Sequence, residues 1–292
     1  MGLINKEKVK KRIGMRLFKS TLSRGLFFLA TSFGLIVLAI LIYRVINQGA
    51  GHLSLDFFTN FASRKPEEAG IKAAIYGTIW LMAITGPVSL ILGVGCAIYL
   101  ELYARKNRFT RFIQMNISNL AGVPSIVFGL LGLTVFVRLL SLDRSVLAGG
   151  LTMSLLILPV IVVAAQEAIR AVPKELQEAS YGMGATKWQT IRRVILPAAI
   201  PGILTGAILA LSRAVGETAP LIMIGAMTYI AFVPENIWSA FTAMPIQIYN
   251  WTSRPQVAFH DVAAAGIIVL LVMLILMNSI AIIIRNKFSK RY

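Results

Sequence analysis

A chain of 292 residues in which 57% are hydrophobic and only 14% are charged does not have the composition of a soluble domain, since soluble domains carry about a quarter charged residues. We therefore expect an integral membrane protein. The net charge of +17 would suggest a nucleic-acid partner in a soluble chain, but basic residues of membrane proteins gather on the cytoplasmic side, so no nucleic acid is expected. The single cysteine, Cys96, excludes a disulfide framework, and His52 and His260 lie far apart, which argues against a metal site.

The N-terminal region combines a basic tail with a long apolar run. Lysines and arginines are frequent before residue 25, and the apolar run extends from Gly25 to Ile42. A cleaved signal peptide would have a shorter apolar core with a small-residue cleavage site behind it. We expect a cytoplasmic basic tail over 1–24 and a retained first membrane helix over 25–46.

Six segments are long and apolar enough to span the hydrocarbon core, which takes about 20 helical residues. They lie near 25–46, 71–100, 113–140, 146–169, 198–228 and 262–284. Prolines inside four of them are compatible with membrane helices, because neighbouring helices re-satisfy the freed backbone groups. Gly202 and Gly206 form a small-xxx-small face suited to close helix packing. The prediction is an all-α membrane protein with six transmembrane helices: the first helix, a five-helix core over 71–284, and a C-terminal tail over 285–292.

The distribution of basic residues predicts the orientation. Lysines and arginines are concentrated in the N-terminal tail, in the loops after the second and fourth segments, and in the C-terminal tail. These regions should face the cytoplasm, which places both termini and the loop over 170–197 on that side. The opposite loop over 229–261 is rich in aromatic residues, and we expect Trp238, Phe241, Tyr249 and Trp251 to lie in the headgroup belt, although an external partner is an alternative.

The loop over 170–197 carries signals for two short helices. Pro173 suits the first turn of a helix, and a small apolar stripe follows at helical spacing, which consists of Leu176, Ala179, Ser180 and Met183. Gly182 and Gly184 can end that helix by taking the left-handed conformation. Thr186 to Gln189 reads as a capping box for a second helix, whose Trp188, Ile191 and Ile195 are expected to lie on the membrane. The first helix could dock in a groove of a partner or serve as an ordinary interfacial connector.

The spacing of this loop resembles the EAA loop of ABC importer permeases. Glu178, Ala179 and Ser180 are followed by Gly184 and then by Val194-Ile195-Leu196-Pro197. The resemblance implies a MetI-like type I permease fold and a coupling helix that inserts into a cleft of an ATP-binding subunit. It also implies that Glu178 contacts that subunit and that Gly184 permits the turn. Ser180 and Val194 stand where alanine and isoleucine are commoner.

Two further stretches resemble signatures of phosphate-importer permeases. They are Ala121-Gly-Val-Pro-Ser-Ile-Val-Phe-Gly-Leu130 and Ser212-Arg-Ala-Val-Gly-Glu-Thr-Ala-Pro-Leu221. The second is more similar to the PstA type than to the PstC type. The resemblance covers about residues 71–284.

Arg213 and Glu217 are the charged residues deepest within apolar sequence. Arg213 lies roughly 16 Å along a helix from Gly202 at 1.5 Å per residue, and Glu217 follows one turn later on the same helix face. Ionisable residues inside the bilayer mark substrate pathways, and a guanidinium matches the oxygens of an oxyanion with two parallel donors. We expect Arg213 and Glu217 to lie on the substrate pathway, with hydroxyls of Ser212 and Thr218 as further donors. A salt bridge that only fixes helix packing is the alternative.

Other polar residues have simpler interpretations. Arg170 at the end of the fourth segment is expected to extend to the membrane surface, and a role at the inner exit of the pathway is the alternative. Asn116, Asn119 and Ser125 are expected to hydrogen-bond between helices.

The combined prediction is a permease subunit of an ABC phosphate importer in the inner membrane of a bacterium. The chain has no Gly-x-x-x-x-Gly-Lys-Ser/Thr loop for nucleotide phosphates, so it is expected to be no enzyme and to hold no cofactor, with ATP and Mg bound by a partner. The resemblance implies a homologous PstC-type permease, a PstB-type ATPase dimer and an external phosphate-binding protein as partners. The alternatives are a permease for sulfate or molybdate, an ion-driven secondary transporter, and a membrane-embedded enzyme, for which no metal set or activated nucleophile is found.

Overall fold

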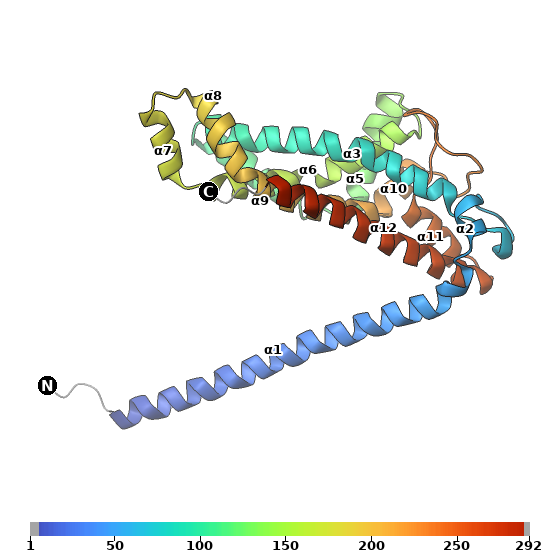
Figure 1. Cartoon of the computed structure of the whole chain (residues 1–292), viewed down its shortest axis with the longest axis horizontal. Helices are drawn as coiled ribbons and strands as arrows, with labels where there is room; N and C mark the ends of the chain where they lie inside the picture. Colours follow the sequence, from blue (N-terminus) through green and yellow to red (C-terminus); the bar gives the residue numbers. More distant parts are fainter. Residues whose placement is uncertain (1–5, 289–292) are drawn as a thin grey trace.

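The computed structural model describes residues 6–288 and is built from helices (Figure 1). In chain order these are α1 (Lys6–Gly49), α2 (Leu55–Thr59), α3 (Lys72–Ile98), α4 (Arg108–Leu120), α5 (Ser125–Gly132), α6 (Val146–Arg170), α7 (Lys174–Gly182), α8 (Lys187–Thr190), α9 (Leu196–Gly216), α10 (Ala219–Ile224), α11 (Met244–Thr252) and α12 (Ala258–Phe288). Short π-helical turns over 99–103, 133–139 and 191–195 extend α3, follow α5 and precede α9. Within residues 6–288, five helices are long and apolar enough to cross a membrane, and there are six spans when the bent pair over 108–139 is counted as one. The predicted all-α, six-span architecture is confirmed.

The centre of the bundle is formed by α3, α6 and α9, which pack closely through small residues. A Cβ added at Gly202 would lie 2.8 Å from the Cβ of Ala168 on α6, and one at Gly206 would meet Ala164 even more closely. The small-xxx-small contact predicted for these glycines is therefore confirmed. Between α3 and α6, the hydroxyl of Thr85 donates to the carbonyl of Gly150 over 3.1 Å, which satisfies a buried polar group inside the bundle.

The third predicted segment is not one helix. It consists of α4 and α5, which are bent by 104° at the break between Leu120 and Ser125. Pro124 stands directly before α5, where its missing N–H and fixed φ allow a helix to start but not to continue from α4. The predicted span over 113–140 was therefore wrong in treating the proline as tolerated within a continuous helix.

The fifth predicted segment is also interrupted. The helix α9 ends at Gly216, Glu217 is extended with φ −76° and ψ 124°, and α10 runs only from Ala219 to Ile224 before Gly225 takes a left-handed φ of 80°. A continuous helix to residue 228 was therefore wrong. The break places Glu217 in the gap between two helices.

The aromatic residues of the loop over 229–261 divide into two groups. Phe241 and Trp251 are fully buried, whereas Trp238 and Tyr249 are exposed. Phe241 belongs to the main hydrophobic core, and Trp251 packs with Phe57 in a second cluster near the opposite end of the bundle from α7. The headgroup-belt prediction was therefore wrong for Phe241 and Trp251, which instead fill the protein interior.

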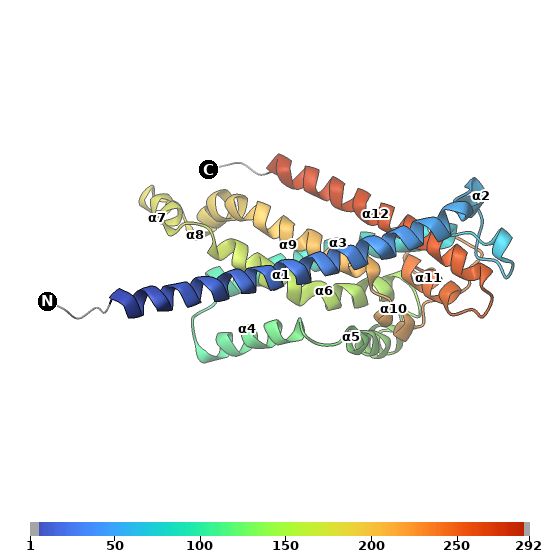
Figure 2. The same ribbon diagram turned by 90° about the horizontal axis from the view of Figure 1, so that it is seen from below.

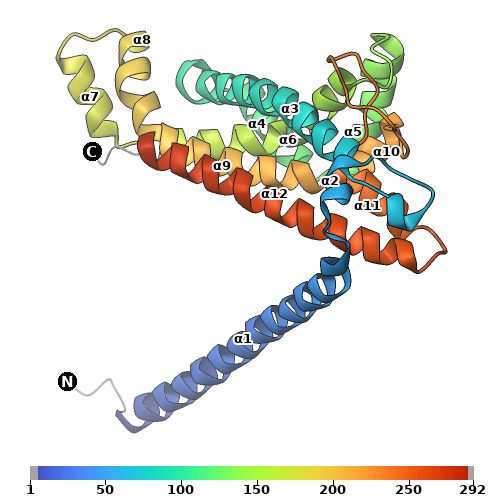
Figure 3. The ribbon, with the colours of Figure 1, turned by 45° about the vertical axis from the view of Figure 1, so that its right-hand side comes forward.

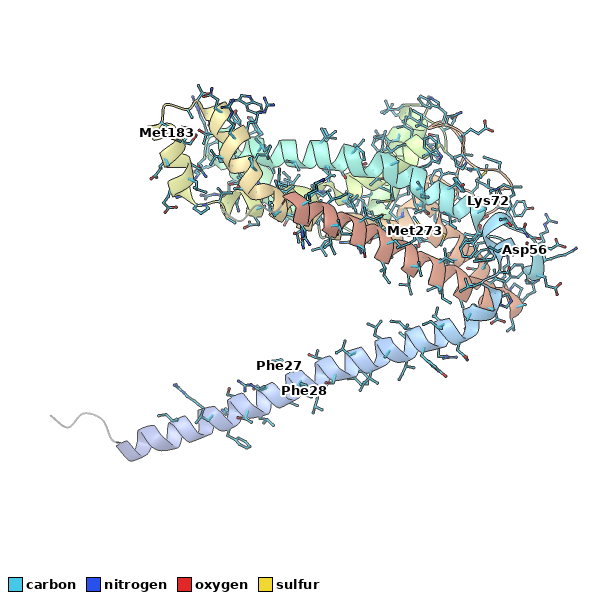
Figure 4. All side chains as sticks on the ribbon, in the orientation of Figure 1. Phe27, Phe28, Asp56, Lys72, Met183 and Met273 are labelled. Atoms are coloured by element: carbon cyan, nitrogen blue, oxygen red, sulfur yellow. The ribbon has the colours of Figure 1, made fainter. Side chains whose placement is uncertain are left out.

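The helix α1 leaves the bundle at a steep angle (Figures 1 and 3). Near its C-terminal end, Gly49 lies against the backbone of Ala264 and Ala265 on α12, and Gln48 Nε2 donates to Asp261 Oδ1 over 2.9 Å. Its apolar side chains, among them Phe27 and Phe28, are exposed along the rest of the helix (Figure 4). The helix begins at Lys6, so the described part of the predicted basic tail is helical, while residues 1–5 and 289–292 lie outside the described residues.

Candidate functional site

The loop between α6 and α9 forms a hairpin of two short helices that projects from one end of the bundle (Figure 1). Pro173 directly precedes α7, and Gly184 turns the chain with a φ of 80°, a conformation that favours glycine because it lacks a Cβ. Thr186 and Gln189 cap α8 reciprocally. The predicted turn at Gly184 and the capping box are confirmed, whereas Gly182 is the last residue of α7 and does not take the left-handed conformation expected of it.

Hydrogen bonding holds α7 against α8. The hydroxyls of Ser180 and Thr190 are both buried and lie 2.9 Å apart. This contact explains a serine where the resembled motif more often has alanine, because Ser180 provides the partner that the buried hydroxyl of Thr190 needs. Glu178 and Ala179 on α7 remain exposed, as does Met183 directly after its end, and Met183 stands at the projecting tip (Figure 4). The hairpin is therefore anchored at its base and open on its outer face.

The segment after α8 is buried rather than membrane-facing. Ile191 and Ile195 are among the most deeply buried residues and pack with α3 and α6; only Trp188 is exposed as expected. The chain forms a π-helical turn over 191–195, and α9 begins at Leu196 with Pro197 in its first turn, where the missing N–H is tolerated. The hairpin is thus joined to α9 through a turn whose Ile191 and Ile195 are packed in the core.

Arg213 and Glu217 form an ion pair at the break between α9 and α10. Arg213 Nε lies 3.1 Å from Glu217 Oε1, and the side chains are 54% and 18% exposed, respectively. The predicted pairing is confirmed, but the pair is not enclosed within this chain, because the guanidinium opens onto the surface of the bundle. Arg213 lies about 26 Å from the start of α9 at 1.5 Å per residue.

The two predicted hydroxyl donors differ in their surroundings. Ser212 Oγ lies 2.7 Å from the carbonyl oxygen of Ile208 and also contacts the side-chain oxygen of Asn278 on α12. These contacts place Ser212 Oγ in the packing between α9 and α12 and argue against its role as a donor to an anion. Thr218 is half-buried next to Glu217, at the N-cap position of α10, and it remains a predicted donor.

The two stretches that resemble phosphate-importer signatures contact each other. A Cβ added at Gly129 of α5 would lie 2.7 Å from Pro220 Cα on α10, so glycine is needed for this approach. The bend at Pro124 and the break after Gly216 thus bring α5 and α10 together just beyond the Arg213–Glu217 pair in the chain.

The arginine at the end of α6 has partners that sequence reasoning missed. Arg170 Nη1 lies 2.9 Å from Glu167, and Nη2 pairs with Glu101 in the π-helical turn that extends α3. Arg170 is 47% exposed at the end of α6, so its extension to the membrane surface stays a prediction, and the two ion pairs are an addition to it. The helical spacing of Glu167 and Arg170 could have indicated the first contact, but nothing local indicates Glu101.

The predicted interhelical asparagine contacts are not formed as expected. Asn116 Nδ2 donates to the carbonyl of Phe112 in its own helix, and Asn119 is exposed beside a cleft between α4 and α6. Over residues 6–288, no group of three or more His, Cys, Asp or Glu side chains could hold a metal ion.

Comparison with known proteins decides the family. Residues 89–292 match the family described as binding-protein-dependent transport system inner membrane component. The chain belongs to this family. It is a multi-pass membrane permease subunit of the ABC importer class.

The relatives are similar over nearly the whole chain. The probable ABC transporter permease protein YqgI of Bacillus subtilis is 32% identical over 89% of this chain and 92% of its own length. The phosphate transport system permease protein PstA 1 of Mycobacterium tuberculosis is 32% identical over 94% of this chain and 90% of its own length. PstA of Haemophilus influenzae is 29% identical over 87% and 89%.

Solved structures show the same fold at low identity. The MetNI methionine ABC transporter matches with a TM-score of 0.60 at 19% identity over 75% of this permease and 97% of that chain. A bacterial transporter for the acidic polysaccharide alginate matches with a TM-score of 0.62 at 17% identity over 94% and 100%. The predicted MetI-like type I permease fold is confirmed.

Proposed function

We propose that this permease subunit carries phosphate across the bacterial inner membrane as part of an ATP-driven importer. The observation that carries the proposal is Arg213, whose guanidinium is paired with a single carboxylate and is 54% exposed at a helix break. A guanidinium offers paired donors to phosphate oxygens. The relatives named as phosphate transport permeases support the same cargo.

The exposed side of Arg213 supports a pathway shared with a second, homologous permease of the PstC type. A charge at this depth is costly in contact with lipid, so the surface around Arg213 should be covered by protein or line a water-filled gap. Glu217 offsets part of the charge, which keeps the site weak enough for release, as a conducting pathway requires. Thr218 lies beside the pair and would add a hydroxyl donor.

The hairpin of α7 and α8 is proposed to couple this pathway to a PstB-type ATPase dimer that binds ATP and Mg. Glu178 and Ala179 lie on the open face of α7, and Ser180 and Gly184 set its shape. The buried turn over 191–195 leads into α9, which has Pro197 in its first turn. A push on α7 would therefore reach the helix that carries Arg213. The basic hairpin end would face the cytoplasm together with both termini, and an external phosphate-binding protein would deliver the anion to the opposite end.

Uptake of labelled phosphate tests the cargo. The complete importer is expressed in cells that lack other phosphate uptake, and sulfate or molybdate is added as competitor. Phosphate uptake that an excess of sulfate and molybdate leaves unchanged is expected. Sulfate uptake undisturbed by phosphate would instead assign the permease to another oxyanion.

The Glu178→Arg variant tests the coupling. Reversing the charge on the open face of α7 should abolish co-purification with the ATPase and uptake together. The matched control is Glu175→Arg, which lies one turn earlier on the same helix and outside the motif. Uptake that continues unchanged after Glu178→Arg has abolished ATPase association would favour an ion-driven transporter without a motor subunit.

A further inference from the structure

A polar cleft between α4 and α6 lies apart from the Arg213–Glu217 pair. It has a volume of about 350 Å³ and opens near the hairpin end of the bundle, where α4 runs alongside α6 (Figure 2). Arg111, Gln114 and Ser118 of α4 line it together with Gln166 and Glu167 of α6. The cleft is within the size range of small-ligand sites in proteins.

One face of α4 is polar along its length, and this face borders the cleft. Arg111, Gln114 and Ser118 recur at helical spacing, and Asn119 adjoins them, so they lie on a single face. Polar residues in a membrane segment normally face a water-filled cavity or another polar group. The face of α4 is therefore suited to a hydrated path and not to lipid.

Gln166 supplies a buried group without a partner. Its side chain lines the cleft, the residue is 6% exposed, and its Nε2 has no hydrogen-bond partner within residues 6–288. Buried amide donors are nearly always hydrogen-bonded. The missing partner is an acceptor, which the described part of the chain does not supply.

The charges around the cleft favour a negative ligand. Arg170 at the mouth is already paired with Glu101 and Glu167. Arg111, by contrast, forms no salt bridge within the described residues. An unpaired guanidinium, an unsatisfied amide donor and the hydroxyl of Ser118 are together the donors that suit an oxyanion.

We propose that this cleft is an inner oxyanion site for the phosphate group, which holds the anion between the Arg213 region and the cytoplasm. Arg111 and Gln166 are the main donors, and Ser118 and Asn119 complete the site. The inference rests on the proposed function for its cargo. A phospholipid headgroup carries the same chemistry and could reach the cleft from the membrane surface.

Thiol protection tests the site in the complete importer. The only cysteine is removed by Cys96→Ser, and Met115→Cys places a thiol in the cleft wall, with Thr205→Cys on the exposed side of α9 as control. The importer is reconstituted in nanodiscs of phosphatidylcholine, and labelling by a charged thiol reagent is timed with and without inorganic phosphate. At a phosphate concentration about ten times the dissociation constant, labelling at position 115 should slow about tenfold, while labelling at position 205 should not change.

Variants and lipid composition separate the possible outcomes. Arg111→Gln and Gln166→Leu should each remove the protection, whereas Arg108→Gln, one turn away and outside the cleft, should retain it. Slower labelling in discs containing phosphatidylglycerol, with no effect of free phosphate and loss of the effect in Arg111→Gln, would assign the oxyanion site to a lipid headgroup. Absence of both effects would overturn the inference.

Uptake measured on the same importer distinguishes this inference from the proposed function. An importer that transports phosphate without any protection at position 115 would refute the inner site alone. Protection by phosphate in an importer that fails to transport it would refute the proposed cargo alone.

Discussion

Arg170 and Arg213 show how the same side chain can be held in two different states within one bundle. Their side chains are similarly exposed, 47% and 54%. Arg170 is nevertheless paired with two carboxylates, one from its own helix and one from the turn after α3, whereas Arg213 is paired with Glu217 only. The number of carboxylates, and not the exposure, separates an arginine that ties helices together from one that is available to an anion.

The largest effect is expected when the available arginine is neutralised. Arg213→Gln should lower phosphate uptake about 10- to 100-fold, because a hydrogen bond to a charged group contributes about 1.5–3 kcal/mol. Co-purification with the partner subunits should be unchanged, since the side chain is not enclosed within its own bundle. Uptake assays on membranes with equal amounts of importer measure this change, and normal uptake would show that Arg213 is as structural as Arg170.

The next effect follows from removing the single carboxylate. Glu217→Gln leaves Arg213 unpaired, so the anion should bind more tightly and leave more slowly. We expect the apparent KM for phosphate to fall about tenfold, together with the maximal rate, which corresponds to about 1.4 kcal/mol of tighter binding. Concentration-dependent uptake measures both constants. A raised KM would mean that Glu217 itself helps to hold the ligand.

Replacing Arg170, which is paired with two carboxylates, should lower the stability of the protein more than it changes phosphate transport. Arg170→Gln leaves Glu101, which is 14% exposed, without its charged partner. Breaking a fully buried pair costs about 3–5 kcal/mol, and because Arg170 is half-exposed we expect a smaller loss of about 1–2 kcal/mol in unfolding free energy.

Thermal unfolding of the purified importer measures the loss, and the double variant Arg170→Gln/Glu101→Gln should recover part of it. A KM for phosphate shifted as strongly as in the Glu217 variant would erase the distinction between the two arginines.

The smallest effect is expected at the neutral contact in the hairpin. Thr190→Val removes one hydroxyl of the buried Ser180–Thr190 pair and should cost about 1 kcal/mol. Limited proteolysis of the α7–α8 hairpin measures the local opening. Ser180→Ala/Thr190→Val, which removes both hydroxyls, should be nearly as stable as the parent; a larger loss for the double variant would show that the hairpin depends on more than this pair.

Features set by neighbouring residues were predictable from the sequence. Gly184, the capping box of α8 and the ion pair of Arg213 and Glu217 each involve residues at most four positions apart. The turn and the cap follow from backbone sterics and local hydrogen bonding. The ion pair was predicted from helix periodicity, and it forms although Glu217 is extended beyond the end of α9. The six apolar spans were predictable for a related reason, since the bilayer sets their length.

Features set by the tertiary arrangement were not predictable. Hydropathy records how apolar a segment is but not its direction, so the 104° bend between α4 and α5 was missed. Arg170 and Glu101 are 69 residues apart, and no local pattern connects them. Phe241 and Trp251 are aromatic residues of the kind that is common at membrane interfaces, yet they are buried in the two hydrophobic clusters.

The contact of Gly49 with α12 has a geometric consequence for the membrane anchor. The 44-residue helix α1 is about 66 Å long at 1.5 Å per residue, and Gly49 at its C-terminal end contacts α12. A Cβ at this position would lie 2.6 Å from the carbonyl carbon of Ala264, so even a methyl group would force the arm to pivot. If α1 tilted as a rigid body so that one 5.4 Å turn next to Gly49 shifted sideways by about 1 Å, the far end of the helix would move by about 12 Å. The absence of a side chain at Gly49 therefore determines the angle at which α1 leaves the bundle.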